Sequence, residues 1–273
     1  MPRGRTRRLL VSRITGAAGA RSSARRPDEL IVEEPMSIQL DGARVATTMR
    51  TPGHDYELAA GFCFTDGLLD GHQITGVRYC ADGSAVDSEF NVVTVETGGV
   101  APTPTPRLGN VSSSCGWCGS DQLDELCARL DPLSPPESVD LDRLASIPEQ
   151  AAEQQSLFGL TGAVHAAAAF DADGHIVVGR EDVGRHNAVD KVVGSLLLAA
   201  PASPAPGAGL GLFVSGRASI EMVQKAWAAG FGSLVAVSAP TALAVDAARR
   251  ANLVLAGFVR GHEFNVYSPE RLD

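Results

Sequence analysis

Two cysteines separated by two residues are the most reactive feature of this sequence. Cys115-Gly-Trp-Cys118 follows a run of serines, and glycine also flanks the pair at position 119. A Cys-x-x-Cys pair serves dithiol redox chemistry, forms half of a zinc site, or provides a nucleophilic thiol that carries sulfur. A zinc ribbon needs a second pair, but the other cysteines, Cys63, Cys80 and Cys127, stand alone. The spacing therefore favours redox chemistry and sulfur transfer equally, and zinc less.

A dense group of charged residues runs from Arg180 to Lys191 (Arg-Glu-Asp-Val-Gly-Arg-His-Asn-Ala-Val-Asp-Lys) at the expected junction of a strand and a helix. The free N–H groups and the positive dipole end of a helix N-terminus suit a phosphate. Arg185 and Lys191 would add positive charge to such a site. In the alternative reading, Asp182 caps the helix and both cations lie in solvent. The segment predicts an anion site.

Two further segments have the layout of an anion-binding edge. Gly211-Leu-Phe-Val-Ser-Gly-Arg-Ala-Ser219 reads as a buried strand that ends in a turn of small residues, with Ser215 and Arg217 in that turn. The run matches neither the P-loop nor the dinucleotide fingerprint. In the last strand and its tail, Arg260 can pair with a phosphate, and Gly261 lets the backbone approach a ligand. Ligands gather at the carboxyl ends of parallel strands, so we expect the turns at 215–219 and 238–241 and the segment after 258 on one edge.

His165 begins a strongly apolar stretch and reads first as a core histidine. A zinc deaminase would place a glutamate two residues after such a histidine and a Pro-Cys-x-x-Cys further on. Ala167 occupies the glutamate position here, and the cysteine pair lies upstream without its proline. Deamination is therefore excluded, and no metal site is predicted.

The elements that must position these residues fall into two patterns. After about residue 157, strands alternate with helices, which is typical of a three-layer α/β domain. The expected strands are 164–170, 175–180, 211–215, 233–238 and 253–259, and the expected helices are 185–199, 219–229 and 241–251. The first two strands should pair antiparallel and the last three parallel, giving a mixed sheet.

The earlier residues predict a small α+β domain. Strands alternate over 29–50 around the hairpin signal Asp41-Gly42, a helix is expected over 54–69, and strands over 74–80 and 90–96. Residues 101–106 alternate with proline and read as a linker, and a helix is expected over 121–130. We therefore divide the chain into a basic disordered extension (1–27), a small α+β domain (28–110) and an α/β domain that begins with the cysteine loop (111–273).

Charge is distributed unevenly and excludes several functions. Residues 1–27 carry eight arginines and no acid, whereas residues 28–273 hold 15 bases against 32 acids, a net of −17. An acidic body argues against nucleic-acid binding. No window approaches 18 uninterrupted apolar residues, so no membrane span is expected. Five cysteines without an apolar export signal indicate reduced thiols and a cytoplasmic location.

Six colinear runs together resemble the formate dehydrogenase accessory sulfurtransferase family. They are Thr51-Pro-Gly-His-Asp-Tyr-Glu-Leu-Ala-Ala-Gly-Phe-Cys-Phe-Thr-Asp-Gly-Leu-Leu69, Ser114-Cys-Gly-Trp-Cys-Gly119, Thr161-Gly-Ala-Val-His-Ala166, Glu181-Asp-Val-Gly-Arg-His-Asn-Ala-Val-Asp-Lys191, Ser215-Gly-Arg-Ala-Ser219 and Ala236-Val-Ser-Ala-Pro-Thr241. The resemblance covers about residues 29–267 and leaves out the arginine-rich head.

The resemblance implies a cytidine-deaminase-like fold for the second domain and a sulfurtransferase activity. Such a protein takes a persulfide from a cysteine desulfurase and passes sulfur to the bis-guanine-dinucleotide molybdenum cofactor of formate dehydrogenase. Cys115 matches the carrier and Cys118 the second cysteine. The family's cofactor segment falls on Phe258, Val259, Arg260, Gly261, His262 and Glu263. Arg180, Arg185, Lys191, Ser215 and Arg217 are further candidates for holding the nucleotide arms, and the pseudo-twofold cargo suits a homodimer.

Two other functions remain as alternatives. A non-catalytic chaperone would bind the cofactor or the apo-enzyme without moving sulfur, and its activity would survive loss of Cys115. A dithiol oxidoreductase would depend on a reversible disulfide between Cys115 and Cys118.

Overall fold

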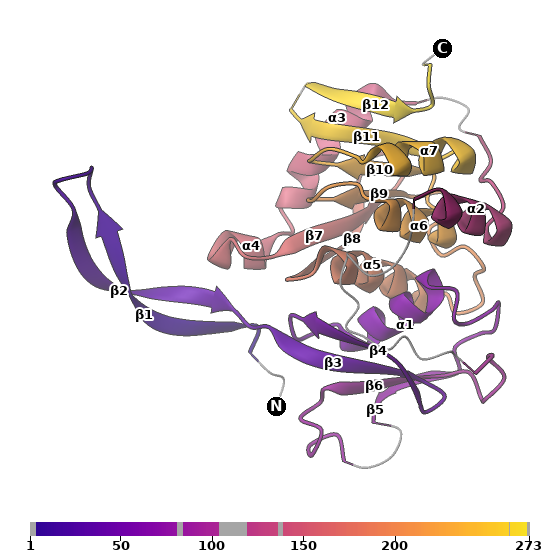
Figure 1. The fold of residues 1–273 in the computed structure, drawn as a ribbon, viewed down its shortest axis with the longest axis horizontal. Helices are drawn as coiled ribbons and strands as arrows, with labels where there is room; N and C mark the ends of the chain where they lie inside the picture. Colours follow the sequence, from indigo (N-terminus) through magenta and orange to yellow (C-terminus); the bar gives the residue numbers. More distant parts are fainter. Residues whose placement is uncertain (1–3, 81–83, 104–118, 136–138, 262, 272–273) are drawn as a thin grey trace.

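The computed structural model describes residues 4–80, 84–103, 119–135, 139–261 and 263–271. Their strands form one sheet of six, one sheet of four and one sheet of two. Figure 1 shows the six-stranded and four-stranded sheets on either side of a layer of helices, with the two-stranded sheet reaching away from both.

The six-stranded sheet forms the centre of the second region and has the order β12-β11-β10-β9-β7-β8. Its strands are β7 (His165–Phe170), β8 (Ile176–Asp182), β9 (Gly211–Val214), β10 (Ser233–Ala236), β11 (Val254–Arg260) and β12 (Glu263–Ser268). β9, β10 and β11 pair parallel, whereas β7 pairs antiparallel with both β8 and β9. The expected mixed sheet and its strand directions are therefore confirmed.

Helices cover both faces of this sheet. They are α2 (Gly119–Arg129), α3 (Leu141–Ala152), α4 (Ser156–Thr161), α5 (Arg185–Ala199), α6 (Ile220–Ala229) and α7 (Ala242–Ala251). Successive side chains of a strand point to opposite faces, so Leu212 and Val214 pack with α5, α6 and α7 while Phe213 packs with α3. The second region is thus a three-layer α/β unit.

The first region is a four-stranded sheet, β4-β3-β6-β5, with one helix. Its elements are β3 (Glu34–Leu40), β4 (Ala43–Arg50), α1 (Asp55–Thr65), β5 (Gly76–Tyr79) and β6 (Val92–Glu96). Met36, Ile38 and Leu40 alternate inward and pack on α1, as the period-two pattern predicts. Leu197 of α5 joins the same cluster, so α1 lies between its own sheet and the second region.

Two glycines let α1 and α5 approach closely. A Cβ at Gly61 would stand 2.7 Å from the carbonyl carbon of Asp190, and one at Gly194 would stand 2.6 Å from that of Glu57. Real Cβ atoms essentially never come this close to backbone. The two regions therefore meet backbone to backbone, and a side chain at either position would push them apart.

Most expected elements are present, with small shifts at their ends. The helix expected over 185–199 has those bounds, and those expected over 54–69, 121–130, 219–229 and 241–251 correspond to α1, α2, α6 and α7. Three elements were not expected from the sequence: α3, α4 and β12. α3 follows a proline-rich loop and contains Pro148, which hid the helical spacing of its buried residues Leu144, Ile147 and Ala151.

The disorder expected for residues 1–27 is contradicted in the described part of that segment. β1 (Thr6–Thr15) and β2 (Ser22–Ile31) form an antiparallel hairpin that also crosses the expected boundary at residue 28. β1 contains threonine, valine and isoleucine, which favour strands. Gly16 has a φ of 101° at the turn, where a side chain would meet the backbone of Ala20. The arginine-rich composition of residues 1–27 suggested disorder and so concealed the pairing of β1 with β2.

Candidate functional site at the carboxyl edge of the parallel strands

The turns after β9 and β10 lie side by side, as the strand directions predict. Ala218 and Pro240 form a parallel bridge, and the Thr241 N–H donates to the Ala218 carbonyl at 3.0 Å. The Phe258 N–H donates to the Ser238 carbonyl at 3.2 Å, which brings the end of β11 to the same place. The expected common edge of 215–219, 238–241 and the segment after 258 is therefore confirmed.

An open pocket of about 450 Å³ lies at this edge, on the face that carries α3 and α4. Its lining is mostly apolar with a few polar groups: Pro148, Gln155, Phe158, Gly162, Ala163, Val164, His165, Val183, Phe213, Ser215 and Val237. This size and composition are typical of a small-molecule site.

Glu181 positions the helix that lines one side of this pocket. Its carboxylate is buried and accepts the backbone N–H groups of Leu157 and Phe158 at 2.9 and 2.8 Å. These are free donors in the first turn of α4, and a carboxylate there also meets the positive end of the helix. Glu181 therefore holds Phe158, which lines the pocket.

Ser215 is part of the pocket lining and also joins two strands. Its Oγ accepts the Ala166 N–H at 2.9 Å, and its own N–H donates to the Ala166 carbonyl at 2.9 Å. This double contact fixes the start of β7 against the end of β9, and so fixes His165 at the pocket. Arg217 is two residues further along the turn and is exposed.

Arg185 brings a positive charge close to the pocket. A side chain at Gly216 would stand 3.5 Å from His165 Nδ1 and 3.9 Å from Arg185 Cδ, so the three residues are neighbours. Arg185 Nε is buried and has no hydrogen-bond partner in the described part of the chain. Leaving a buried donor unsatisfied costs about 1–3 kcal/mol, so an anionic ligand would bind favourably here.

Two histidines beside Arg185 are held in the neutral form. Burial, together with the charge of Arg185, lowers the pKa of His165, although Asp182 opposes the shift. Burial and the charges of Lys225 and Arg185 lower the pKa of His186 to about 4. Neutral imidazole can donate and accept hydrogen bonds, so His165 can contact a polar ligand in the pocket at pH 7.

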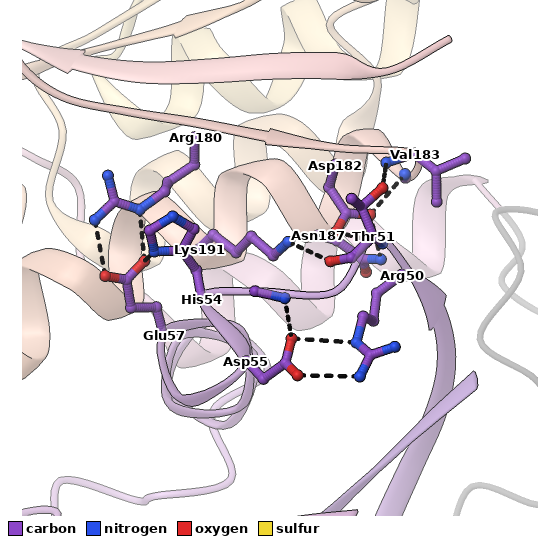
Figure 2. A network of polar contacts seen from close by, with 12 residues as sticks. Arg50, Thr51, His54, Asp55, Glu57, Arg180, Asp182, Val183, Asn187 and Lys191 are labelled. Carbon is purple, nitrogen blue, oxygen red and sulfur yellow. Dashed lines mark hydrogen bonds and ion pairs between the residues drawn. The ribbon is translucent and has the colours of Figure 1, made fainter. Parts of the chain in front are cut away.

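Lys191 does not belong to this site, which contradicts its expected role in holding a phosphate. Its side chain is 0% exposed, and Nζ lies 2.6 Å from Asp182 Oδ2 and donates to the Thr51 carbonyl at 2.9 Å. Figure 2 shows this side chain reaching Asp182 and Thr51 at the contact between the two regions. Lys191 comes six residues, or about one and two-thirds turns, after Arg185 in α5, and this rotation turns it away from the edge.

Arg180 is also engaged elsewhere. Its Nη2 donates to Glu57 Oε1 at 2.7 Å and to Ser195 Oγ at 3.0 Å, and His54 contacts the same glutamate (Figure 2). Burial raises the pKa of Glu57, but the hydrogen bonds and charges of Arg180 and His54 lower it to about 2. Arg180 therefore joins the two regions and leaves Arg185 as the arginine of its segment at the edge.

The segment expected to hold the cofactor divides between core and surface. Val259 is fully buried in the cluster under α3, so it offers a ligand only its backbone. Phe258 is 47% exposed and has a φ of 57°, an uncommon conformation for a bulky residue. Arg260, Gly261 and Glu263 are exposed at the turn between β11 and β12, and His262 lies outside the described residues.

The carrier candidates Cys115 and Cys118 also lie outside the described residues. The helix that follows them is well anchored, because Leu123 and Leu126 of α2 are buried in the main core. Arg250 of α7 donates to Asp124 Oδ1 at 2.9 Å. The other cysteines, Cys63, Cys80 and Cys127, are free thiols, and the first two are buried.

One cluster in the described part of the chain has ligand types that suit a metal: Asp171, Asp173 and His175. It lies in the turn between β7 and β8. Asp171 Oδ1 already accepts the N–H groups of Asp173 and His175 at 2.9 Å each. These bonds explain the cluster as turn chemistry.

The pocket includes residues that sequence reasoning did not select. His165, which lines the pocket, was interpreted as a core residue. Phe158 and Gln155 lie on or beside α4, which was not expected at all. The one available signal for His165 was its place at the start of a strand that pairs antiparallel with β9, which puts this start beside the small-residue turn after β9.

Fold and site together define a mixed α/β protein with an open pocket at the carboxyl edge of its parallel strands. The chain belongs to the FdhD/NarQ family, whose model matches residues 31–273. It is 40% identical over 278 residues to "Sulfur carrier protein FdhD" of Corynebacterium efficiens, covering 97% of this chain and 98% of that protein. It is 47% identical to the protein of the same name from Streptomyces avermitilis, covering 90% and 89%.

A solved structure supports the fold. The chain superposes on a putative formate dehydrogenase accessory protein from Desulfotalea psychrophila with a TM-score of 0.74 and 24% identity, covering 97% of this chain and 99% of the other. No helix among the described residues is long and apolar enough to cross a membrane.

Proposed function

We propose that this chain is a sulfur carrier that accepts a persulfide on Cys115 and passes sulfur to the molybdenum cofactor of a formate dehydrogenase. The observation that carries the proposal is the identity of 40–47% to relatives named sulfur carrier protein over most of the chain. The cysteine pair, the pocket and the cationic edge are the parts of this chain that such a function needs.

The chemistry assigns the carrier role to an accessible thiolate. The Cys115 thiolate attacks the outer sulfur of the desulfurase persulfide, a new S–S bond forms, and the desulfurase cysteine leaves as a thiolate. Cys63 is a poor candidate because burial and the nearby carboxylates of Asp66 and Asp190 raise the pKa of its thiol. Cys127 is exposed and its Sγ accepts a contact from Arg250 at 3.8 Å, so it is the cysteine to test against Cys115.

The edge pocket is our candidate site for the cargo, a bis-guanine-dinucleotide molybdenum cofactor. Its phosphates are anionic, and Arg185, Arg217 and Arg260 are the cations at or near the edge. The unsatisfied Nε of Arg185 fits an anionic oxygen. Phe258, Gly261 and Glu263 stay candidates on their exposed turn, as does Ser215 in the pocket lining. Lys191 is excluded by its burial.

The donor is a cysteine desulfurase in the cytoplasm, where thiols stay reduced. The chain acts as a homodimer, since a cargo with two similar nucleotide arms suits a twofold axis. The second region has a cytidine-deaminase-like fold, with His165 at the position of a lost metal ligand.

Sulfur-adduct mapping tests the carrier role. The protein is incubated with a cysteine desulfurase and cysteine, and peptides of wild type, Cys115→Ala, Cys118→Ala and Cys127→Ala are examined by mass spectrometry. We expect a gain of one sulfur atom on Cys115, which is absent only in Cys115→Ala. An adduct that moves with Cys127, or no adduct beside an active desulfurase, would contradict the proposal.

The pocket also supports a second candidate, a chaperone that binds the cofactor without carrying sulfur. Activation of apo-formate dehydrogenase separates the two. The chaperone requires Cys115→Ala to activate as well as wild type, whereas the carrier requires activation to be lost.

A further inference from the structure

The segment around α4 forms one wall of the pocket at the carboxyl edge. Five of the eleven residues that line the pocket lie between positions 155 and 164, and one of them is Phe158. Phe158 is 49% exposed, so much of its ring is open to water beside the pocket. A ligand that covers this ring would remove apolar surface from water, which favours binding at this wall.

The main chain of Phe158 is fixed on both sides. Its N–H donates to Glu181 Oε1 at 2.8 Å, and its carbonyl accepts the Gly162 N–H at 2.7 Å. Gly162 ends α4 with a φ of 64°, a left-handed conformation that glycine adopts without strain. Leu157, the preceding residue, is buried. The ring of Phe158 is thus carried by a short helix that is held at both ends, and little freedom remains to be lost when a ligand binds.

The pocket is uncharged inside and positive at its rim. None of the described residues that line it carries a formal charge at pH 7, because burial and the charge of Arg185 lower the pKa of His165. Arg185 lies just beside His165, since a side chain at Gly216 would contact both. A ligand with one anionic end and one flat, uncharged end would therefore turn its anionic end toward Arg185 and place the other in the pocket.

We propose that the uncharged end is the base of a nucleotide, that Phe158 stacks on this base, and that Glu181 acts through α4 as a positioning residue for the contact. A nucleobase has a flat π face for an aromatic ring and polar edge atoms, for which Gln155 and the hydroxyl of Ser215 are available in the lining. The pocket of about 450 Å³ has room for one nucleoside. The inference rests on the proposed cargo, whose two nucleotide arms each carry a guanine, and assigns the pocket to one such base.

Isothermal titration calorimetry with guanosine diphosphate and with inorganic pyrophosphate separates stacking from charge. We expect Phe158→Ala to raise the Kd of guanosine diphosphate about tenfold, as for the loss of one stacked base, and to leave the Kd of pyrophosphate unchanged. Leu160→Ala is the control and should match wild type, because Leu160 is 62% exposed on the same helix but is not among the described residues of the lining. An unchanged Kd for guanosine diphosphate in Phe158→Ala, or an equal rise for pyrophosphate, would overturn the stacking role.

Glu181→Gln tests the positioning role, because it removes one of the two oxygens that accept N–H groups of α4. We expect it to raise the Kd of guanosine diphosphate about threefold in the wild-type background and not at all in Phe158→Ala. A residue that acts through another has no effect once the other is gone. Equal rises in both backgrounds would show that Glu181 affects binding independently of Phe158. Circular dichroism checks that each variant is folded.

Tryptophan fluorescence gives a second readout that does not depend on the Glu181 variant. Phe158→Trp keeps an aromatic ring on the wall, and stacking on guanine quenches the emission of an indole ring. We expect guanosine diphosphate to quench Phe158→Trp but not Leu160→Trp, after subtraction of the signal of wild type, which has two tryptophans of its own. Quenching of both variants, or of neither, would contradict the assignment.

Two further outcomes would overturn the inference in ways that can be told apart. Binding of pterin-6-carboxylate that is lost in Phe158→Ala, with guanosine diphosphate unaffected, would assign the wall to the pterin of the cargo instead of its base. No binding of guanosine diphosphate to wild type would overturn both this inference and the proposed cargo site. The carrier role would still be tested separately by sulfur-adduct mapping on Cys115.

Discussion

The contact between α1 and α5 and the carboxyl edge of the parallel strands both draw on the segment 180–191, yet they treat its charges differently. At the contact, Asp182, Lys191 and Asp190 are buried and each has a charged or polar partner. At the edge, Arg185 keeps a buried N–H without a partner in the described part of the chain.

The difference separates charges that hold the fold from charges that can bind a ligand. Lys225 illustrates the first kind: it is buried, and Nζ donates to both oxygens of Asp190 at 2.8 and 2.9 Å. Burial lowers the pKa of Lys225, but Asp190 and Asp66 raise it above its ordinary value, so the lysine stays charged. A charge already satisfied in this way has little left to offer a ligand.

Among the substitutions that test this difference, Lys191→Met is expected to change the free energy of unfolding most. Removing the ammonium leaves Asp182 buried without its cation, which typically destabilises a protein by about 3–5 kcal/mol. Urea denaturation gives the free energy of unfolding. Arg44→Met at an exposed site is the matched control and should change it by less than about 0.5 kcal/mol. Equal effects of the two substitutions would show that Lys191 does not hold the regions together.

The close approach of the helices is tested by Gly194→Ala. The new methyl would meet the backbone of Glu57, and overpacking of this kind costs about 1–3 kcal/mol. Gly159→Ala is the control, because Gly159 is also helical and a Cβ there meets nothing within 4 Å. Thermal melts should show a lower Tm for the first and an unchanged or higher Tm for the second. Similar Tm values for both would argue that the helices can separate without penalty.

A smaller, pH-dependent effect is expected from Glu57→Gln. The folded-state pKa of Glu57, about 2, lies below the ordinary 4.5, so its ionised form stabilises the fold above pH 4.5 and this contribution disappears as the pH falls toward 2. Glu57→Gln should therefore be less stable than wild type at pH 7, by about 1–2 kcal/mol. Denaturation at pH 7, 4 and 2.5 measures the gap, and a gap that does not narrow on acidification would refute the ion-pair role.

Much of the fold could be predicted because periodicity and turn chemistry are local. Asp41-Gly42 marked the β3–β4 hairpin, and the alternation of apolar strands and helices after residue 157 indicated the mixed sheet. The β1–β2 hairpin could not be predicted in the same way, because arginines dominate its composition and no Asn-Gly or Asp-Gly pair marks its turn. α3 was missed because Pro148 and the preceding prolines disguise a helix whose stability comes from packing under the sheet.

The candidate site was predicted in part. Strand directions located the edge, and Ser215 and Arg217 follow from it. Lys191 was assigned to the site because both faces of α5 carry charged residues. The sequence does not show which of these faces points toward the edge. His165 was not selected as a site residue because its role depends on its neighbours Gly216 and Arg185. These two residues are distant in sequence and lie beside His165 only in the folded chain.

Binding of guanosine diphosphate, a probe for one nucleotide arm of the cargo, tests most directly whether the edge binds the ligand. Isothermal titration calorimetry compares wild type, Arg217→Ala and the control Arg44→Ala. We expect Arg217→Ala to raise Kd about tenfold, the loss of a charged hydrogen bond, with Tm unchanged, and Arg44→Ala to match wild type. An unchanged Kd in Arg217→Ala, or an equal loss in both variants, would contradict the division between fold-holding and ligand-binding charges.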